Sequence, residues 1–185
     1  MITTATGEPI LQFTELKTLY PESKRLESCK ANETAIYRQW GFSNDRAVTA
    51  DYDGDGKADF ALFRPSNGHW YRIYSNNGQF VFQQFGLTGD IPAHADYDGD
   101  NKSDLAVFRP SQGAWYILGS STGFAFRQFG LNGDVPVPAD YDGDRKDDIA
   151  VFRNGTWYIL RSTEGYTEPN FGLPGDIPIP IKYVP

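Results

Sequence analysis

The sequence is poor in the residues that most enzymes and disulfide-rich proteins depend on. Its 185 residues include one cysteine, one methionine and two histidines. Cys29 alone cannot form an intramolecular disulfide, so cysteine usage does not indicate a redox compartment. No apolar stretch approaches the roughly 20 residues of a membrane span. Residues 1–30 also lack the basic start and apolar run of a signal peptide, so we expect the chain as given to be soluble.

The balance of charge disfavours another class of partner. The formal charge is −7, whereas recognition through phosphate neutralisation needs a basic surface, so no nucleic-acid partner is expected. Nineteen glycines, twelve prolines and an aromatic share of 15% are instead typical of a chain that turns often and packs aromatic side chains in short strands. We therefore expect an all-β fold with little helix.

An internal repeat dominates the chain. The motif begins as DYDGDGKADFALFRP at Asp51, as DYDGDNKSDLAVFRP at Asp96 and as DYDGDRKDDIAVFR at Asp140, with spacings of 45 and 44 residues. Each copy continues with a Trp-Tyr pair, a Phe-Gly pair and a turn that ends in Gly-Asp. The tryptophans are Trp70, Trp115 and Trp157, and the turn aspartates are Asp90, Asp134 and Asp176. Three full units of a repeat architecture are therefore present.

Both ends of the chain contain fragments of the same unit. Residues 37–51 align with the segment before the second Asp-rich loop, and GDIPIPIKYVP at the C-terminus matches the start of a further unit. The predicted organisation is an N-terminal extension over residues 1–34 and repeats over residues 35–185. The units lie at about 46–86, 90–130 and 134–172, with a lone strand at 176–183.

Within a unit the hydrophobic pattern has a period of two. In the first unit, strand-like segments cover residues 59–64, 69–74 and 79–85, and a further one precedes the next loop at 91–95. Four short strands per unit predict the blade of a β-propeller, whose radial sheets leave few exposed edges. In the third unit Pro169 cannot donate to a ladder, so we expect the last strand to lie at a sheet edge.

Each unit also carries one loop with aspartates at positions 1, 3, 5 and 9 and a lysine at position 7. Calcium takes about six to eight oxygen ligands, which such a loop supplies from alternate carboxylates and the main-chain carbonyl at position 7. The lack of His and Cys ligands disfavours zinc. We predict three calcium ions per chain, held by Asp51, Asp53, Asp55, Lys57 and Asp59; by Asp96, Asp98, Asp100, Lys102 and Asp104; and by Asp140, Asp142, Asp144, Lys146 and Asp148.

The loops do not fit an EF-hand, because position 12 holds Leu62, Val107 or Val151 in place of a bidentate Glu. Turns rich in Asp and Gly are also common between strands without any metal. The same acidic spacing at three equivalent places nevertheless favours metal binding. Arg145 stands at position 6, where a left-handed backbone is expected, so we predict that the third site is the weakest.

Together these motifs resemble the FG-GAP repeat, the unit of integrin-α-like propellers. The resemblance covers about residues 35–185 and rests on the DxDGDxxxD loop, the VFRP and WYIL strands and the FGLxGD turn. It implies that the loop joins the first and second strands of each blade, that the cation is calcium, and that the protein is secreted or at the cell surface. Members act mostly in adhesion, in carbohydrate recognition or as accessory domains of extracellular enzymes.

The number of units departs from this family, since three blades fall short of the roughly four that ring closure normally requires. Residues 177–181 and strands from residues 1–40 would complete a fourth blade within one chain. The same segments would alternatively pair between two chains, giving a homodimer that completes the propeller. A third alternative is that the chain is a fragment of a longer propeller. We favour assembly between chains and leave the other two open.

No catalytic constellation accompanies the repeats. The sequence has no Gly-x-Ser-x-Gly elbow, phosphate loop or histidine-rich metal motif, and His69 and His94 belong to no repeated pattern. We expect a non-enzymatic, lectin-like or adhesion module with a glycan or protein ligand. The tryptophans are expected to pack the blades, and stacking on sugars is the lesser alternative. The alternative function is an accessory or structural domain of a larger secreted hydrolase.

Overall fold

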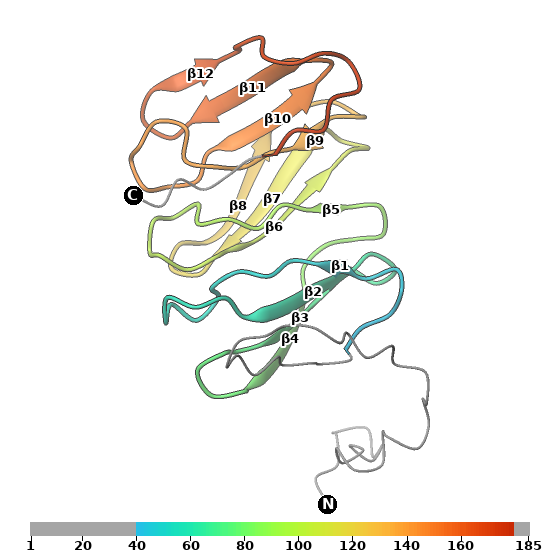
Figure 1. The fold of residues 1–185 in the computed structure, drawn as a ribbon, viewed down its shortest axis with the longest axis vertical. Helices are drawn as coiled ribbons and strands as arrows, with labels where there is room; N and C mark the ends of the chain where they lie inside the picture. Colours follow the sequence, from blue (N-terminus) through green and yellow to red (C-terminus); the bar gives the residue numbers. More distant parts are fainter. Residues whose placement is uncertain (1–39, 180–185) are drawn as a thin grey trace, which may run out of the picture. The chain divides into compact units, whose positions relative to one another are not determined.

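The computed structural model describes residues 40–179, which form three antiparallel sheets of four strands each (Figure 1). No helix occurs in this part of the chain, so the predicted all-β class is confirmed. The described residues therefore contain no membrane-spanning helix. The first sheet contains β1 (Arg46–Ala47), β2 (Phe60–Arg64), β3 (His69–Ile73) and β4 (Phe80–Gln84). The second contains β5 (Ile91–Pro92), β6 (Leu105–Arg109), β7 (Ala114–Gly119) and β8 (Gly123–Gln128), and the third contains β9 (Val135–Pro136), β10 (Ile149–Arg153), β11 (Thr156–Arg161) and β12 (Gly165–Thr167).

Each sheet is a meander in which strands that follow one another in sequence lie side by side. The Asp-rich loops therefore join the first and second strands of each sheet. β12 lies at a sheet edge and ends before Pro169, which has no amide to continue the ladder. Residues 176–179 belong to no strand. The rest of the predicted C-terminal strand and the predicted extension over residues 1–34 lie outside the described residues.

The second strand of each sheet is the most buried one. In β6 and β10 every residue except the terminal arginine is buried, whereas the outermost strands β4 and β8 are largely exposed. A strand that reads as a continuous apolar run is typical of a sheet covered on both faces. β6 thus has a neighbouring sheet on either side, whereas the outer face of β10 is covered by residues of its own repeat unit.

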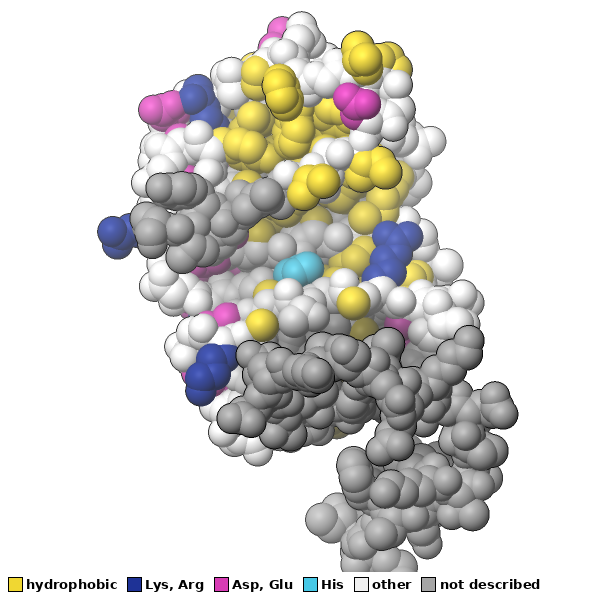
Figure 2. All heavy atoms as spheres, viewed as in Figure 1, with side chains coloured by type: hydrophobic (Ala, Val, Ile, Leu, Met, Phe, Trp, Pro, Cys, Tyr) yellow, Lys and Arg dark blue, Asp and Glu magenta, His cyan; other side chains and the backbone are white. Residues whose placement is uncertain are grey.

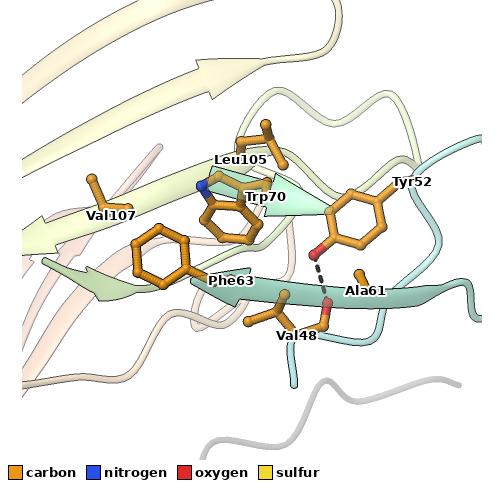
Figure 3. Packing of buried hydrophobic residues seen from close by; sticks show 7 residues of the cluster. All are labelled: Val48, Tyr52, Ala61, Phe63, Trp70, Leu105 and Val107. Atoms are coloured by element: carbon orange, nitrogen blue, oxygen red, sulfur yellow. Dashed lines mark hydrogen bonds between the residues drawn. The ribbon is translucent and has the colours of Figure 1, made fainter. Parts of the chain in front are cut away.

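The hydrophobic core lies between successive sheets. Phe63 and Trp70 of the first sheet pack on Leu105 and Val107 of β6 in the second sheet (Figure 3). Phe63 and Trp70 are also cross-strand partners, with ring centroids 5.2 Å apart, and such aromatic pairs stabilise a sheet beyond their buried area. An equivalent cluster joins the second sheet to the third through Ile149 and Val151.

The third sheet has a core of its own residues only, built on Phe152 and Ile159. Within residues 40–179 no sheet follows it, so the described sheets do not close into a ring. On the side shown in Figure 2, hydrophobic side chains gather over this sheet. Near its end Phe171, Leu173 and Ile177 are between 70% and 85% exposed.

In each sheet a bidentate ion pair joins the turn before the first strand to the end of the second strand. Asp90 accepts the amide of Leu87 at 2.8 Å, and its two oxygens accept the Nε and Nη2 donors of Arg109, both at 2.8 Å. The same arrangement joins Asp45 to Arg64 and Asp134 to Arg153. Asp45, Asp90 and Asp134 are therefore acceptors for both their own turn and an arginine of the second strand.

Candidate metal centres

The three Asp-rich loops follow the same backbone path. In each one, the alanine just before position 1 forms a β-bridge with the residue at position 9. Position 6 has a positive φ in every loop, at 81° for Gly56, 66° for Asn101 and 73° for Arg145. Glycine and asparagine tolerate this left-handed region, whereas arginine is strained in it. The strain predicted for the third loop is therefore present in its backbone.

The aspartates at positions 1, 3 and 9 come together in every loop. In each group the residues offer one carboxylate oxygen apiece, and these oxygens lie within 4.8 Å of one another. The groups are Asp51, Asp53 and Asp59; Asp96, Asp98 and Asp104; and Asp140, Asp142 and Asp148. Three carboxylates at this spacing are compatible with one shared metal ion, since a hard cation accepts all-oxygen ligation.

The carboxylate at position 9 is the most buried member of each group. Asp59 is 0% exposed, and its Oδ2 and Oδ1 accept the amides of Tyr52 at 2.9 Å and Ser75 at 2.7 Å. Asp104 and Asp148 accept the equivalent pairs of amides at the same distances. These fixed donors orient the carboxylate in advance, and a bound cation would restrain it further.

The tyrosine that follows position 1 fixes the loop from its other end. The hydroxyl of Tyr52 donates to the carbonyl of Val48 at 2.6 Å (Figure 3). Tyr97 and Tyr141 make the equivalent bonds to Ala93 and Val137. Burial raises the pKa of all three phenols above their ordinary value. The tyrosine therefore remains a neutral donor throughout the physiological range.

The aspartates at position 5 do not belong to the three groups. Asp55 instead accepts the amide of Lys57 at 2.8 Å and the hydroxyl of Ser75 at 3.2 Å. Asp100 and Asp144 bond the hydroxyls of Ser120 and Ser162 in the same way. These serines, which follow the third strand of each sheet, were not among the predicted site residues. The signal that marks them is a serine at the same place in every unit.

The environment of position 3 differs between loops. Oδ2 of Asp98 accepts the amides and hydroxyls of Ser121 and Thr122, and Oδ2 of Asp142 accepts the equivalent donors of Thr163 and the amide of Glu164. In contrast, Oδ2 of Asp53 and Oδ1 of Asp98 are buried with no hydrogen-bond partner. A buried carboxylate oxygen without a donor is costly, and a cation would satisfy it.

Mutual proximity and burial shift the pKa of several of these aspartates. Burial raises the pKa of Asp104 to about 6, although amides of Ser120 and Tyr97 oppose the rise. Burial also raises the pKa of Asp53, and the neighbouring carboxylates of its loop add to the effect. The hydroxyl of Thr163 lowers the pKa of Asp142. A cation among these carboxylates would favour their ionised forms.

The lysines at position 7 contact the preceding loop. A Cβ built on Gly54 would meet the side chain of Lys102 at 2.9 Å, and one built on Gly99 would meet that of Lys146 at 3.1 Å. The lysine side chain therefore covers the glycine at position 4 of the loop before it. Gly143 in the third loop has open space at the same place. The assignment of the position-7 carbonyls as metal ligands stays a prediction.

The remaining candidates do not assemble into a site. His94 packs near Tyr52 and Trp70, with ring centroids 6.1 and 6.3 Å away, while His69 bonds the backbone of Asn67. Trp70 and Trp115 are 0% exposed, so these two rings cannot stack on a sugar. Their indole N–H groups donate to the carbonyls of Phe85 and Phe129. Cys29 lies outside the described residues.

Comparison of the chain with protein-family models, with curated proteins and with solved structures yields no match in any of the three. The resemblance to the FG-GAP repeat therefore rests on the motifs alone.

Proposed function

We propose that each Asp-rich loop binds one calcium ion and that the chain works as a calcium-stabilised binding or adhesion module outside the cell. The observation that carries the proposal is the convergence of three carboxylates in each of three equivalent loops. The buried oxygens of Asp53 and Asp98 that lack a protein donor support it further. Three divalent ions would also cancel most of the formal charge of −7.

Calcium suits these loops better than softer metals. The groups contain only carboxylates, and oxygen ligands are those that calcium prefers, whereas zinc favours nitrogen and sulfur. The aspartates at positions 1, 3 and 9 would hold the ion directly. Those at position 5 would ligate it through a water or after release from their serine, and the position-7 carbonyl would complete the shell.

A bound ion would tie together parts of a sheet that are distant in sequence. The position-9 carboxylate bonds the amide of the serine after the third strand, as Asp59 does with Ser75. The same loop sits between the first and second strands. The ion would therefore lock three strands of each sheet at one end, which is a structural role and leaves ligand recognition to other surfaces.

We propose that the sheets are blades of a propeller completed by a second chain. Support comes from the third sheet, whose face carries no following sheet within residues 40–179, unlike the corresponding faces of the other two. The chain has a mass of 20.7 kDa, so light scattering of a dimer would give twice that value. A monomeric mass with and without calcium would contradict the dimer and leave the metal sites untouched.

The ligand of the module is proposed to be a glycan or a protein that contacts exposed aromatic rings. Since Trp70 and Trp115 are buried, we consider the exposed rings on the outermost strands. Phe82 on β4 and Phe124 on β8 are 64% and 63% exposed. Aromatic rings offer apolar faces to sugars and to protein side chains alike.

Isothermal titration with calcium tests the metal sites. We expect three ions per chain for the unaltered protein and two for Asp98→Ala. The matched control is Asp176→Ala, which removes a turn carboxylate outside the loops and should keep three. No heat of calcium uptake would refute the proposal.

A glycan array in calcium and in EDTA tests recognition, with Phe82→Ala as the variant. Absence of binding in both conditions would leave a protein ligand as the remaining choice.

A further inference from the structure

Asp147 joins the second and third loops through two hydrogen bonds. It occupies position 8 of the third loop, where the other loops have Ala58 and Ser103. Its amide donates to the carbonyl of Asp96 at 2.7 Å, and its Oδ2 accepts the amide of Asp96 at 2.8 Å. Asp147 is 7% exposed and Asp96 is 3% exposed. The two residues therefore hold each other by a reciprocal, buried pair of bonds.

Asp96 is the position-1 residue of the second loop, and its carboxylate organises that loop. Its Oδ1 accepts the amide of Gly99 at 2.7 Å, and its Oδ2 accepts that of Asn101 at 2.9 Å. The backbone of Asp96 is fixed from the third loop while its side chain shapes the second. A shift of this backbone would therefore move a carboxylate that belongs to the second acidic group.

The first and second loops are joined by only one of the two equivalent hydrogen bonds. The amide of Ser103 donates to the carbonyl of Asp51 at 2.7 Å, which corresponds to the backbone bond of Asp147. No side-chain acceptor for the amide of Asp51 occurs among the described residues. The following loop thus bonds position 1 of the first loop through its backbone alone, and position 1 of the second loop through its backbone and a side chain.

We infer that Asp147 is a positioning residue for the second metal site and couples that site to the third. It directly precedes Asp148, the position-9 residue of the third group, so adjacent residues serve two different ions. This inference rests on the proposed metal binding. An ion in the third loop fixes Asp148 and with it Asp147, which favours the second site. By thermodynamic linkage an ion in the second loop favours the third equally.

Calcium affinity of the second loop in isolation provides the test. The combined changes Asp53→Ala and Asp142→Ala leave the second loop as the one intact acidic group among residues 40–179. In this background Asp147→Ser, which introduces the residue found at position 8 of the second loop, should weaken calcium binding about tenfold, the usual effect of losing a partner that orients a ligand. Asp147→Asn retains an acceptor oxygen and should restore most of the affinity.

The matched control uses the first loop. With Asp98→Ala and Asp142→Ala the first loop alone is intact, and Ser103→Ala should leave its calcium affinity unchanged because that junction uses only the backbone. In the background with Asp53→Ala and Asp142→Ala, equal calcium affinities with and without Asp147→Ser would overturn the inference. The proposed metal sites would not be affected by that result. Absence of calcium binding by the unaltered chain would overturn both.

Amide hydrogen exchange of the unaltered protein gives a second readout that needs no variant. In calcium the amide of Asp96 should exchange at least about tenfold more slowly than the amide of Asp51, because a buried acceptor protects only the former. Equal exchange of the two amides would contradict the proposed role of Asp147 even if Asp147→Ser failed to fold.

Discussion

The carboxylate of Asp59 accepts the backbone amide of Ser75 at 2.7 Å, across 16 residues of sequence. Asp59 lies at the end of the acidic loop, and Ser75 lies just after the third strand of the same sheet. The contact recurs in the second and third sheets. A residue of the candidate metal site is therefore also a residue of the sheet framework, and the stability of the two should be linked.

Removal of calcium should lower the melting temperature. With the ion at about ten times its dissociation constant, each site contributes about 1.4 kcal/mol, and three sites contribute about 4 kcal/mol. That is a large part of the roughly 5–15 kcal/mol by which a typical domain is stable. Differential scanning calorimetry in calcium and in EDTA measures the difference. Identical melting curves in the two conditions would be incompatible with the proposed sites.

Substitution of Asp104 should destabilise the chain even in EDTA. Asp104 is 1% exposed and accepts two amides, so Asp104→Ala leaves buried donors without partners and should cost about 3 kcal/mol. The control Asp100→Ala in the same loop removes a more exposed carboxylate and should cost about 1 kcal/mol. Urea denaturation in EDTA separates this effect from metal binding. Equal costs would show that the amides do not depend on Asp104.

The ion pair between Asp90 and Arg109 should be important for folding. Asp90 is 2% exposed, and removal of one partner of a buried pair costs about 3–5 kcal/mol. Asp90→Ala should therefore strongly lower the urea midpoint. Asp176 accepts the amide of Leu173 in the same type of turn but has no arginine partner within residues 40–179. A similar loss for Asp176→Ala would mean that the turn, and not the arginine, matters.

Burial of His94 should make stability depend on pH. Burial lowers its pKa from 6.5 to about 4, despite a hydrogen bond with the backbone of Thr49. Between these two pKa values the unfolded chain therefore binds more protons than the folded chain. The stability that the neutral, buried His94 contributes is fully present above pH 6.5 and is lost as the pH falls toward 4. His94→Gln should remove it.

The test of that dependence is a difference between two proteins, because Asp104 titrates near pH 6 with the opposite sign. Its raised pKa means that protonation stabilises the fold as the pH falls. Urea denaturation is measured for the unaltered chain and for His94→Gln, both in EDTA at pH 5 and pH 7. The difference in unfolding free energy between the two proteins cancels the contribution of Asp104, which both share. An unchanged gap between the two proteins at both pH values would show that His94 is not the group responsible.

The loops and strands were predictable from sequence because their signals are local and occur three times. Short apolar runs that end in arginine specify β2, β6 and β10, and the spacing of aspartates specifies the acidic groups. The partners of those aspartates were not predictable, since Ser75 and Asp147 reach them through the folding of a hairpin and the packing of neighbouring sheets. Whether the sheets close into a propeller ring was also not predictable, because closure depends on surfaces beyond a single unit.

The third loop should become stronger when Arg145 is replaced by glycine. Arg145 has a φ of 73°, and a left-handed backbone costs a residue with a Cβ about 1–2 kcal/mol. Its amide bond to Oδ2 of Asp140, at 3.0 Å, is made by the backbone and survives the change. Arg145→Gly also removes a positive charge beside the ion, so calcium affinity of this loop should rise.

The control for that gain is Asn101→Gly in the second loop. Asparagine tolerates its φ of 66° with little strain, so glycine there adds only the usual backbone entropy of the unfolded chain, about 0.5–1 kcal/mol of destabilisation. Urea denaturation in calcium should therefore show the two substitutions acting in opposite directions. If Arg145→Gly destabilises the chain as much as Asn101→Gly does, the strain at position 6 is not what limits the third site, and its predicted weakness would need another cause.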